Sequence, residues 1–218
     1  MKITWFGQSY FQILTGLYKK NQQTLSIIID PFTEKIGLKP PKNQADILLI
    51  SHDKIEKNEI AKSVSGKPFL IDAPGEYETK GISFRAIPSF SKGGGRNLIF
   101  KIDTENLRIC HLGVLNQKEL NNEQLESIGL VDILMVPVGG EEVISAKEAK
   151  EIIAEIEPKV VIPMYYFIPK LKIKIETLDN FLKIMGEKGI PPQDQLKIQK
   201  GDKILEGESF TIIVLNPK

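Results

Sequence analysis

The sequence predicts a layered α/β or α+β protein, in which two packed β-sheets carry helices on their outer faces. The first half of the chain reads as short β-rich runs separated by turns. The second half alternates strands with amphipathic helices. With 218 residues, of which 41% are hydrophobic, the chain is long enough to bury a sizeable core. No repeat or linker-like stretch interrupts it, so we expect a single domain over residues 1–218.

The first half is expected to be a series of strands joined by short turns. The predicted strands are Lys2–Phe6, Tyr10–Thr15, Thr24–Asp30, Asp46–Ser51, Lys67–Ala73, Glu76–Ile87, Asn97–Asp103 and Leu107–Leu112. Pro31 ends the third strand, because proline cannot donate to a β-ladder. The continuous apolar run 46–51 indicates a strand buried on both faces. The polar stretch 52–65 is compatible with a helix.

The second half carries clear helix signals. Asn121 and Gln124 form a capping-box pattern before a helix that ends at Ile128, and Ser145 and Glu148 repeat this pattern. The second of these helices extends to Glu157 and has apolar residues at i, i+3, i+4 and i+7. A further helix is expected around Leu178–Met185, closed by Gly186 or Gly189. The remaining predicted strands are Val131–Val138, Lys159–Pro163, Leu196–Gln199 and Phe210–Leu215.

Composition excludes several classes of function. The chain has 29 basic and 28 acidic residues, and this balance argues against a nucleic-acid-binding protein. A single cysteine forms no internal disulfide. The chain opens directly on a strand pattern without a targeting segment, and no apolar run approaches a membrane span. We therefore expect a cytoplasmic protein with no membrane partner. The sequence leaves room for a small anionic ligand and for a homo-oligomer.

The histidine count limits metal chemistry. Zinc and iron sites draw mainly on His, Cys and carboxylate ligands. With two histidines and one cysteine, the chain cannot build a His-rich centre for two metal ions.

An ordered set of motifs identifies a family resemblance that covers the chain from Lys2 to Leu215. The motifs are Gly7-Gln8-Ser9-Tyr10-Phe11, Ile29-Asp30-Pro31-Phe32, the run 45–53 ending in Ser51-His52-Asp53, Pro74-Gly75-Glu76-Tyr77-Glu78, His111-Leu112-Gly113, the run 131–140 ending in Gly139-Gly140, and Val161-Ile162-Pro163-Met164. In order and spacing they resemble the metallo-β-lactamase superfamily, most of all its small single-domain zinc-dependent hydrolase-like proteins of bacteria and archaea. The resemblance implies a four-layer αββα sandwich with a metal site at one edge of the two sheets.

The resemblance also implies where the metal ligands belong, and most of them are missing. His52 holds the first ligand position, and Glu56 replaces an aspartate with a longer carboxylate. Five further ligand positions hold Lys54, Lys57, Ser91, Val114 and Tyr165. Gln8 stands where a histidine is usual near the site, and His111 lies beside a site motif without replacing a lost ligand. Valine has no donor atom, and a protonated lysine has no lone pair.

This loss suggests two functional hypotheses. The first is a non-catalytic binding or regulatory protein without a metal cofactor, although the family would imply zinc. The alternative is a hydrolase with a non-standard site, either metal-independent through Lys54 or Lys57, or with a single metal on His52 and Glu56. A third hypothesis is a subunit whose partner supplies the activity.

For several residues the sequence leaves more than one interpretation. His52 is either a packed relic of the ligand set or a pocket-lining base or donor. Lys54 and Lys57 either reach solvent or join Ser91 and Tyr165 in an anion-binding pocket. His111 is expected to be a partly buried strand residue, and Cys110 an inert buried thiol.

Overall fold

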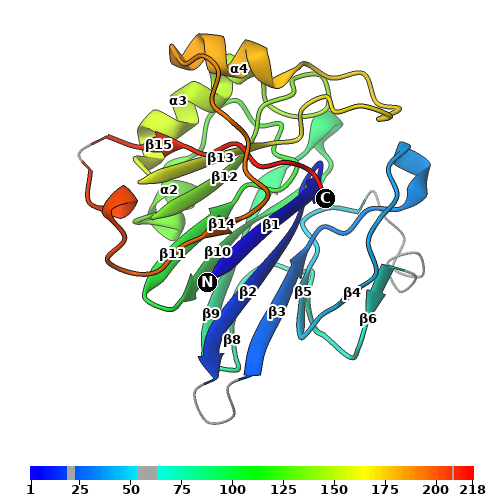
Figure 1. The fold of residues 1–218 in the computed structure, drawn as a ribbon, viewed down its shortest axis with the longest axis vertical. Coiled ribbons are helices and arrows are strands. Elements are labelled where there is room, and N and C mark those ends of the chain that lie inside the picture. The colour runs from blue at the N-terminus through cyan, green and yellow to red at the C-terminus, as the bar shows by residue number, and fades with distance from the viewer. Residues whose placement is uncertain (19–22, 54–62, 208) are drawn as a thin grey trace.

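A computed structural model describes residues 1–218 except 19–22, 54–62 and 208. Within these residues, two β-sheets pack face to face (Figure 1). The first sheet has the strand order β14-β1-β2-β3-β5-β7 and the second β15-β13-β12-β11-β10-β9-β8. The strands of the first sheet are β1 (Lys2–Gly7), β2 (Tyr10–Tyr18), β3 (Gln23–Ile29), β5 (Ile47–Leu49), β7 (Phe69–Ile71) and β14 (Leu196–Lys197).

The second sheet begins as antiparallel hairpins and continues as parallel strands. Its strands are β8 (Gly75–Thr79), β9 (Ile82–Phe90), β10 (Arg96–Thr104), β11 (Leu107–His111), β12 (Ile133–Pro137), β13 (Val160–Met164) and β15 (Thr211–Ile212). Strands β11, β12 and β13 run in the same direction, so their carboxyl ends meet at one edge. A small third sheet pairs β4 (Asn43–Gln44) with β6 (Val64–Ser65).

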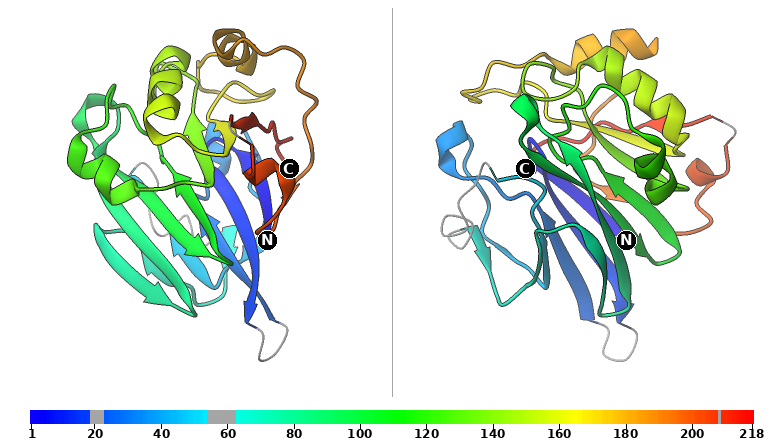
Figure 2. Two further views of the ribbon diagram at one scale, coloured as in Figure 1. Left: turned by 90° about the vertical axis from the view of Figure 1, so that its left-hand side faces the viewer. Right: turned by 180° about the vertical axis from the view of Figure 1, so that it is seen from behind.

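Helices gather on the outer side of the second sheet (Figure 2). They are α2 (Asn122–Ile128), α3 (Ala146–Ile156) and α4 (Leu178–Met185), and the single-turn helices of the chain are η1 (Glu34–Ile36), η2 (Lys92–Gly94) and η3 (Lys203–Leu205). Both predicted capping boxes are formed, at Asn121 and at Ser145. Gly186, in the left-handed conformation, ends α4 as expected.

Alternation along the first sheet separates two cores. Residues of one face, such as Trp5, Phe11 and Ile29, join the large core between the sheets. Residues of the other face, such as Phe6, Tyr10 and Ile28, form a smaller outer core that is covered by the 31–45 segment. This arrangement leaves the strand ends, and not the strand faces, for a site.

The structure also differs locally from the sequence predictions. The stretch 52–65 is compatible with a helix by sequence; Ser63 is helical, Val64 and Ser65 form a short strand, and residues 54–62 lie outside the description. Several predicted strands are shorter, for example β5, which spans Ile47–Leu49 within the predicted run 46–51. In the part of the chain that is described, no helix is long and apolar enough to cross a lipid bilayer.

Candidate active site

The candidate site lies where β3, β5, β11 and β13 end. Asp30 follows β3 and Ser51 follows β5, and these two strands are parallel, with Ile29 opposite Leu49. The pairing therefore brings Asp30 and Ser51 side by side. His52 comes next in the chain and forms an isolated bridge with Asn97 of β10, which reaches across from the second sheet.

A buried hydrogen-bond chain connects Asp30, Ser51 and His52. The Ser51 amide donates to Asp30 Oδ1 at 2.7 Å, and the Ser51 hydroxyl donates to Oδ2 at 2.6 Å. The same hydroxyl lies 2.9 Å from His52 Nδ1, which is itself 3.7 Å from Asp30 Oδ2. Because the hydroxyl gives its only proton to Asp30, we assign the proton of His52 to Nδ1. This leaves Nε2 as the basic nitrogen of His52.

Asp30 is held in its charged form. Burial alone would raise the pKa of its carboxyl group, but the interaction with the His52 ring and the hydrogen bonds around it lower the pKa below the ordinary value. Its backbone adopts a left-handed φ of 46°, which non-glycine residues adopt rarely. In the sequence Asp30 ends a predicted strand and belongs to the motif Ile29-Asp30-Pro31-Phe32, but no role at the site was predicted for its carboxylate.

Asn97 fixes the loop after β11 and was also missed. Its Oδ1 accepts from the Val114 amide at 2.8 Å, and its Nδ2 donates to the Leu112 carbonyl at 3.0 Å. Between them Gly113 has a φ of 64°, and a Cβ there would lie 2.3 Å from Asn97 Oδ1. Only glycine fits this crossing. Val114 is fully buried, and it contributes a backbone contact to the site but no donor side chain.

His111 has a structural role beneath the site. Its Nδ1 accepts from the Gly113 amide at 3.1 Å, so Nε2 carries the proton and donates to the Ser9 carbonyl at 3.0 Å. Burial lowers its pKa, against the attraction of Asp30. The ring is fully buried, where the sequence predicted partial burial. This neutral histidine joins the two sheets.

Tyr165 and Gln8 meet through their backbones on the other side of the site. The Tyr165 amide donates to the Gln8 carbonyl at 3.2 Å. Both residues adopt left-handed φ angles, 55° and 51°. Burial and the negative charges of Glu142 and Asp30 raise the pKa of the Tyr165 phenol, so this group stays protonated. With Asp30, three strained residues surround the site, and such strain is concentrated at functional sites in proteins.

Ser91 lies in a turn after β9. Its amide donates to the Gly95 carbonyl at 2.8 Å, and its carbonyl accepts from Gly94 at 3.1 Å. Lys92 then pairs with Glu142 at 2.9 Å, which ties the turn to the loop before α3. The glycine-rich segment is therefore a closed turn. Lys54, Glu56 and Lys57 lie outside the described residues, so the anion-pocket hypothesis that includes Lys54 and Lys57 stays a prediction.

The described donors do not fit a binuclear metal centre. At the ligand positions they supply one imidazole, one hydroxyl, one protonated phenol and one side chain without a donor, which are His52, Ser91, Tyr165 and Val114. Among the described residues, no three His, Cys, Asp or Glu side chains come together as a metal site.

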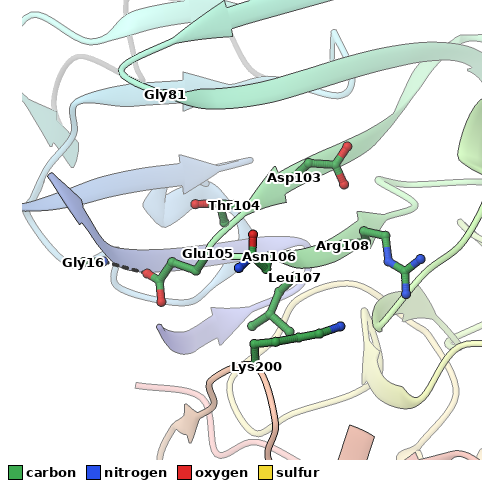
Figure 3. A pocket seen from close by; sticks show the side chains of 9 residues that line it. All are labelled: Gly16, Gly81, Asp103, Thr104, Glu105, Asn106, Leu107, Arg108 and Lys200. Carbon is green, nitrogen blue, oxygen red and sulfur yellow. Dashed lines mark hydrogen bonds between the residues drawn. The ribbon is translucent and has the colours of Figure 1, made fainter. Parts of the chain in front are cut away.

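A separate cavity of about 830 Å³ lies at the opposite end of β11, around the hairpin that joins it to β10 (Figure 3). Two of its charged side chains, Glu105 and Arg108, are engaged in structural contacts. Glu105 accepts from the Gly16 amide at 2.6 Å, and Arg108 binds Asp132 through two hydrogen bonds of 2.9 and 2.7 Å. None of the described residues expected at the site, which are Gln8, His52, Ser91, His111, Val114 and Tyr165, lines this cavity.

Comparison with known proteins decides the family. A family model described as "Beta-lactamase superfamily domain" matches residues 2–165. The chain belongs to this family. A "UPF0173 metal-dependent hydrolase" of Thermococcus onnurineus is 27% identical over 94% of this chain and 99% of its own length. A protein of the same description from Thermoplasma acidophilum is 27% identical over 76% of this chain and 83% of its own.

A solved structure supports the same assignment. A Thermotoga maritima protein, assigned to the Zn-dependent hydrolases of the metallo-β-lactamase superfamily, is 31% identical with a TM-score of 0.78. The alignment covers 98% of this chain and 97% of that one. The predicted family and its sandwich fold are thereby confirmed.

These comparisons correct the first functional hypothesis. Relatives of this superfamily are named as metal-dependent hydrolases, and nothing in the comparisons indicates a non-catalytic binding or regulatory protein. The names also speak against the expectation of a chain without a metal cofactor, at the level of the family. The first hypothesis was wrong because it relied only on the number of metal ligands that the sequence retains. It did not anticipate the hydrogen bonds that connect Asp30 through Ser51 to His52.

Proposed function

We propose that this protein is a hydrolase of the metallo-β-lactamase superfamily with a non-standard site, in which His52 acts as the general base. The observation that carries the proposal is the hydrogen-bond chain from Asp30 through Ser51 to His52 Nδ1. A base oriented in this way keeps one protonation pattern, with Nε2 available to take a proton.

The chemical step uses groups of this chain. His52 Nε2 removes a proton from a water molecule while the water oxygen forms a bond to the acyl or phosphoryl centre of the substrate. The bond between this centre and the leaving group then breaks, and the His52 imidazolium returns the proton to the leaving oxygen. The positive charge that develops on the imidazole is stabilised by the Asp30 carboxylate, which lies 3.7 Å from Nδ1. Tyr165, which stays protonated, supplies a hydrogen-bond donor for the negative charge that develops on the substrate.

The test is hydrolysis of p-nitrophenyl acetate, p-nitrophenyl phosphate and bis(p-nitrophenyl) phosphate by wild-type protein and by His52→Asn. Each protein is assayed after chelator treatment and after addition of zinc, so that any metal requirement is measured separately. We expect His52→Asn to lower kcat/KM by about 100-fold or more, the usual contribution of a general base. Tyr165→Phe should lower it less.

Circular dichroism and thermal unfolding serve as the control for folding of both variants. If no substrate is turned over under any condition, or if His52→Asn retains wild-type kcat/KM, the proposal is wrong.

A further inference from the structure

A second cavity, of about 780 Å³, opens over the outer core of the first sheet. One wall is apolar and consists of Phe32, Pro40 and Pro41. Residues of the 33–42 segment supply most of the remaining lining, and Lys218 closes it from the other end of the chain. Figure 1 marks this end of the chain beside β1, where the Lys218 amide donates to the Trp5 carbonyl at 3.1 Å. The size lies within the range of about 300–1,000 Å³ that is typical of small-molecule sites.

The apolar wall is firmly held. Phe32 is 4% exposed, and its ring meets Tyr10 edge-on with centroids 5.5 Å apart. The Tyr10 hydroxyl in turn accepts from Asn43 Nδ2 at 3.0 Å. Tyr10 therefore holds the Phe32 ring in place, and the ring also borders the cavity. A preformed apolar surface binds a ligand without the cost of ordering it.

The segment above the wall is also anchored. Gly37 has a φ of 94°, and a Cβ there would lie 2.2 Å from the Lys170 carbonyl oxygen. Next to it, the Ile36 carbonyl accepts from the Lys172 amide at 2.9 Å. Pro40 and Pro41 further restrict the backbone. These contacts hold the segment against the 167–176 loop and keep the cavity open.

The charge at the mouth of the cavity is strongly positive. Among the described lining residues, four are lysines, Lys35, Lys39, Lys42 and Lys218, and Glu34 has the one acidic side chain. Lys218 also pairs with Asp194 at 3.2 Å. The positive charge at the mouth therefore comes mainly from Lys39 and Lys42, which are exposed. The whole chain has a net charge of only +1, and this local excess of cations is therefore a specific feature.

We propose that this cavity binds a single-chain anionic amphiphile, a molecule with an alkyl or acyl body and a carboxylate or phosphate head. The apolar body would lie on Phe32, Pro40 and Pro41, and the head would accept hydrogen bonds from Lys39 and Lys42. None of Gln8, His52 and Tyr165 lines the cavity, so the proposal does not depend on hydrolysis at the candidate active site.

The test is calorimetric titration of the full chain with decyl phosphate below its micelle concentration. Inorganic phosphate, decanol and decyltrimethylammonium are titrated in parallel, because each lacks one part of the recognised chemistry. We expect each of them to bind at least about tenfold more weakly than decyl phosphate, the equivalent of one lost charge-assisted hydrogen bond or of the apolar contact. Affinity for decyl phosphate should fall as salt is added.

Three variants locate the binding. We expect the double variant Lys39→Gln/Lys42→Gln to bind decyl phosphate at least about fivefold more weakly, through loss of the paired charges. Lys118→Gln/Lys188→Gln, which removes two exposed lysines outside the cavity lining, should keep wild-type affinity. Thr33→Trp adds a bulky ring in the lining without a charge change and should abolish binding.

Equal affinity for decyl phosphate and decyltrimethylammonium would overturn the proposal, as would wild-type affinity of both the Lys39/Lys42 double variant and Thr33→Trp. It would also be wrong if the protein bound anionic vesicles but not monomeric decyl phosphate, since a membrane surface would then be the partner.

Discussion

At the scale of single residues, Ser51 determines which nitrogen of His52 carries the proton. Its hydroxyl stands between Asp30 Oδ2 and His52 Nδ1. We expect Ser51→Ala to lower kcat/KM about 10- to 100-fold, the usual effect of removing a group that orients a site histidine. We also expect the free energy of unfolding to fall by about 1–3 kcal/mol, because the Asp30 carboxylate loses a buried donor.

The matched control for Ser51→Ala is Ser26→Ala. Ser26 is buried, and its hydroxyl accepts from Gln12 at 3.0 Å within the first sheet. This variant should lose some stability and keep the wild-type kcat/KM. Steady-state kinetics and urea unfolding measure both effects, and an unchanged kcat/KM in Ser51→Ala would contradict the assigned role.

Gln8 is expected to lower the stability of the fold, whereas Ser51 is expected to raise it. It is 4% exposed, and neither Oε1 nor Nε2 has a hydrogen-bond partner among the residues that the structure describes. A buried polar group without a partner costs stability. We therefore expect Gln8→Leu to raise the free energy of unfolding in urea by about 1–3 kcal/mol. Gln12→Leu should instead be destabilising, because the Gln12 amide donates to Ser26. Destabilisation by Gln8→Leu would show that the carboxamide is engaged.

At the scale of elements, the helix caps are the features that the sequence predicts best. We expect Ser145→Ala to lower the free energy of unfolding by about 0.5–2 kcal/mol, because its side chain accepts from the Glu148 amide at the start of α3. Thr177→Ala at the start of α4 is the control, since Thr177 makes no side-chain cap hydrogen bond. Equal losses in the two variants, measured by urea unfolding, would refute the capping argument.

Local signals explain which elements could be predicted. A capping box or a closing glycine acts within four residues, so α2, α3 and α4 were predicted with nearly correct ends. The two-residue strands β4 and β6 carry no comparable signal, because they depend on pairing between residues 21 positions apart. The site roles of Asp30 and Asn97 were not predicted for the same reason, because each residue hydrogen-bonds a partner that another strand brings close.

At the scale of the whole molecule, the pattern of strands and helices along the sequence predicted two packed sheets. The family resemblance predicted that the site lies at one edge of these sheets. The strand order itself does not follow from alternation, because pairing between distant strands leaves no mark on either strand alone. The division of the chain into a single domain over residues 1–218 stays a prediction.

Acid stability of the molecule depends on Asp132, which pairs with Arg108 between β11 and the start of β12. Burial would raise the pKa of this carboxyl, but hydrogen bonds and attraction from Arg108 lower it below the ordinary value. A carboxyl whose pKa is lowered by folding adds stability above its unfolded pKa, and this contribution is lost as the pH falls through the lower, folded value.

We therefore expect Asp132→Asn to reduce the free energy of unfolding at pH 7 by about 1–3 kcal/mol and to flatten its decline between about pH 5 and pH 2. Urea unfolding over this pH range measures both effects. Asp194→Asn is the control, since the Asp194–Lys218 pair is exposed and screened by solvent. If the free energy of unfolding of Asp132→Asn falls with acid as steeply as that of the wild type, other carboxylates cause the acid sensitivity.

The pairing of β1 with β14 has a consequence for synthesis of the chain. Lys2 lies opposite Lys197, so β1 receives one of its two neighbours only after the residues up to β14 have been synthesised. At about 5–20 residues per second, this edge of β1 stays open for about 10–40 s during translation. Unpaired strand edges are templates for wrong association. Nascent chains that stop before residue 196 should therefore depend on chaperones more than chains that include β14 do.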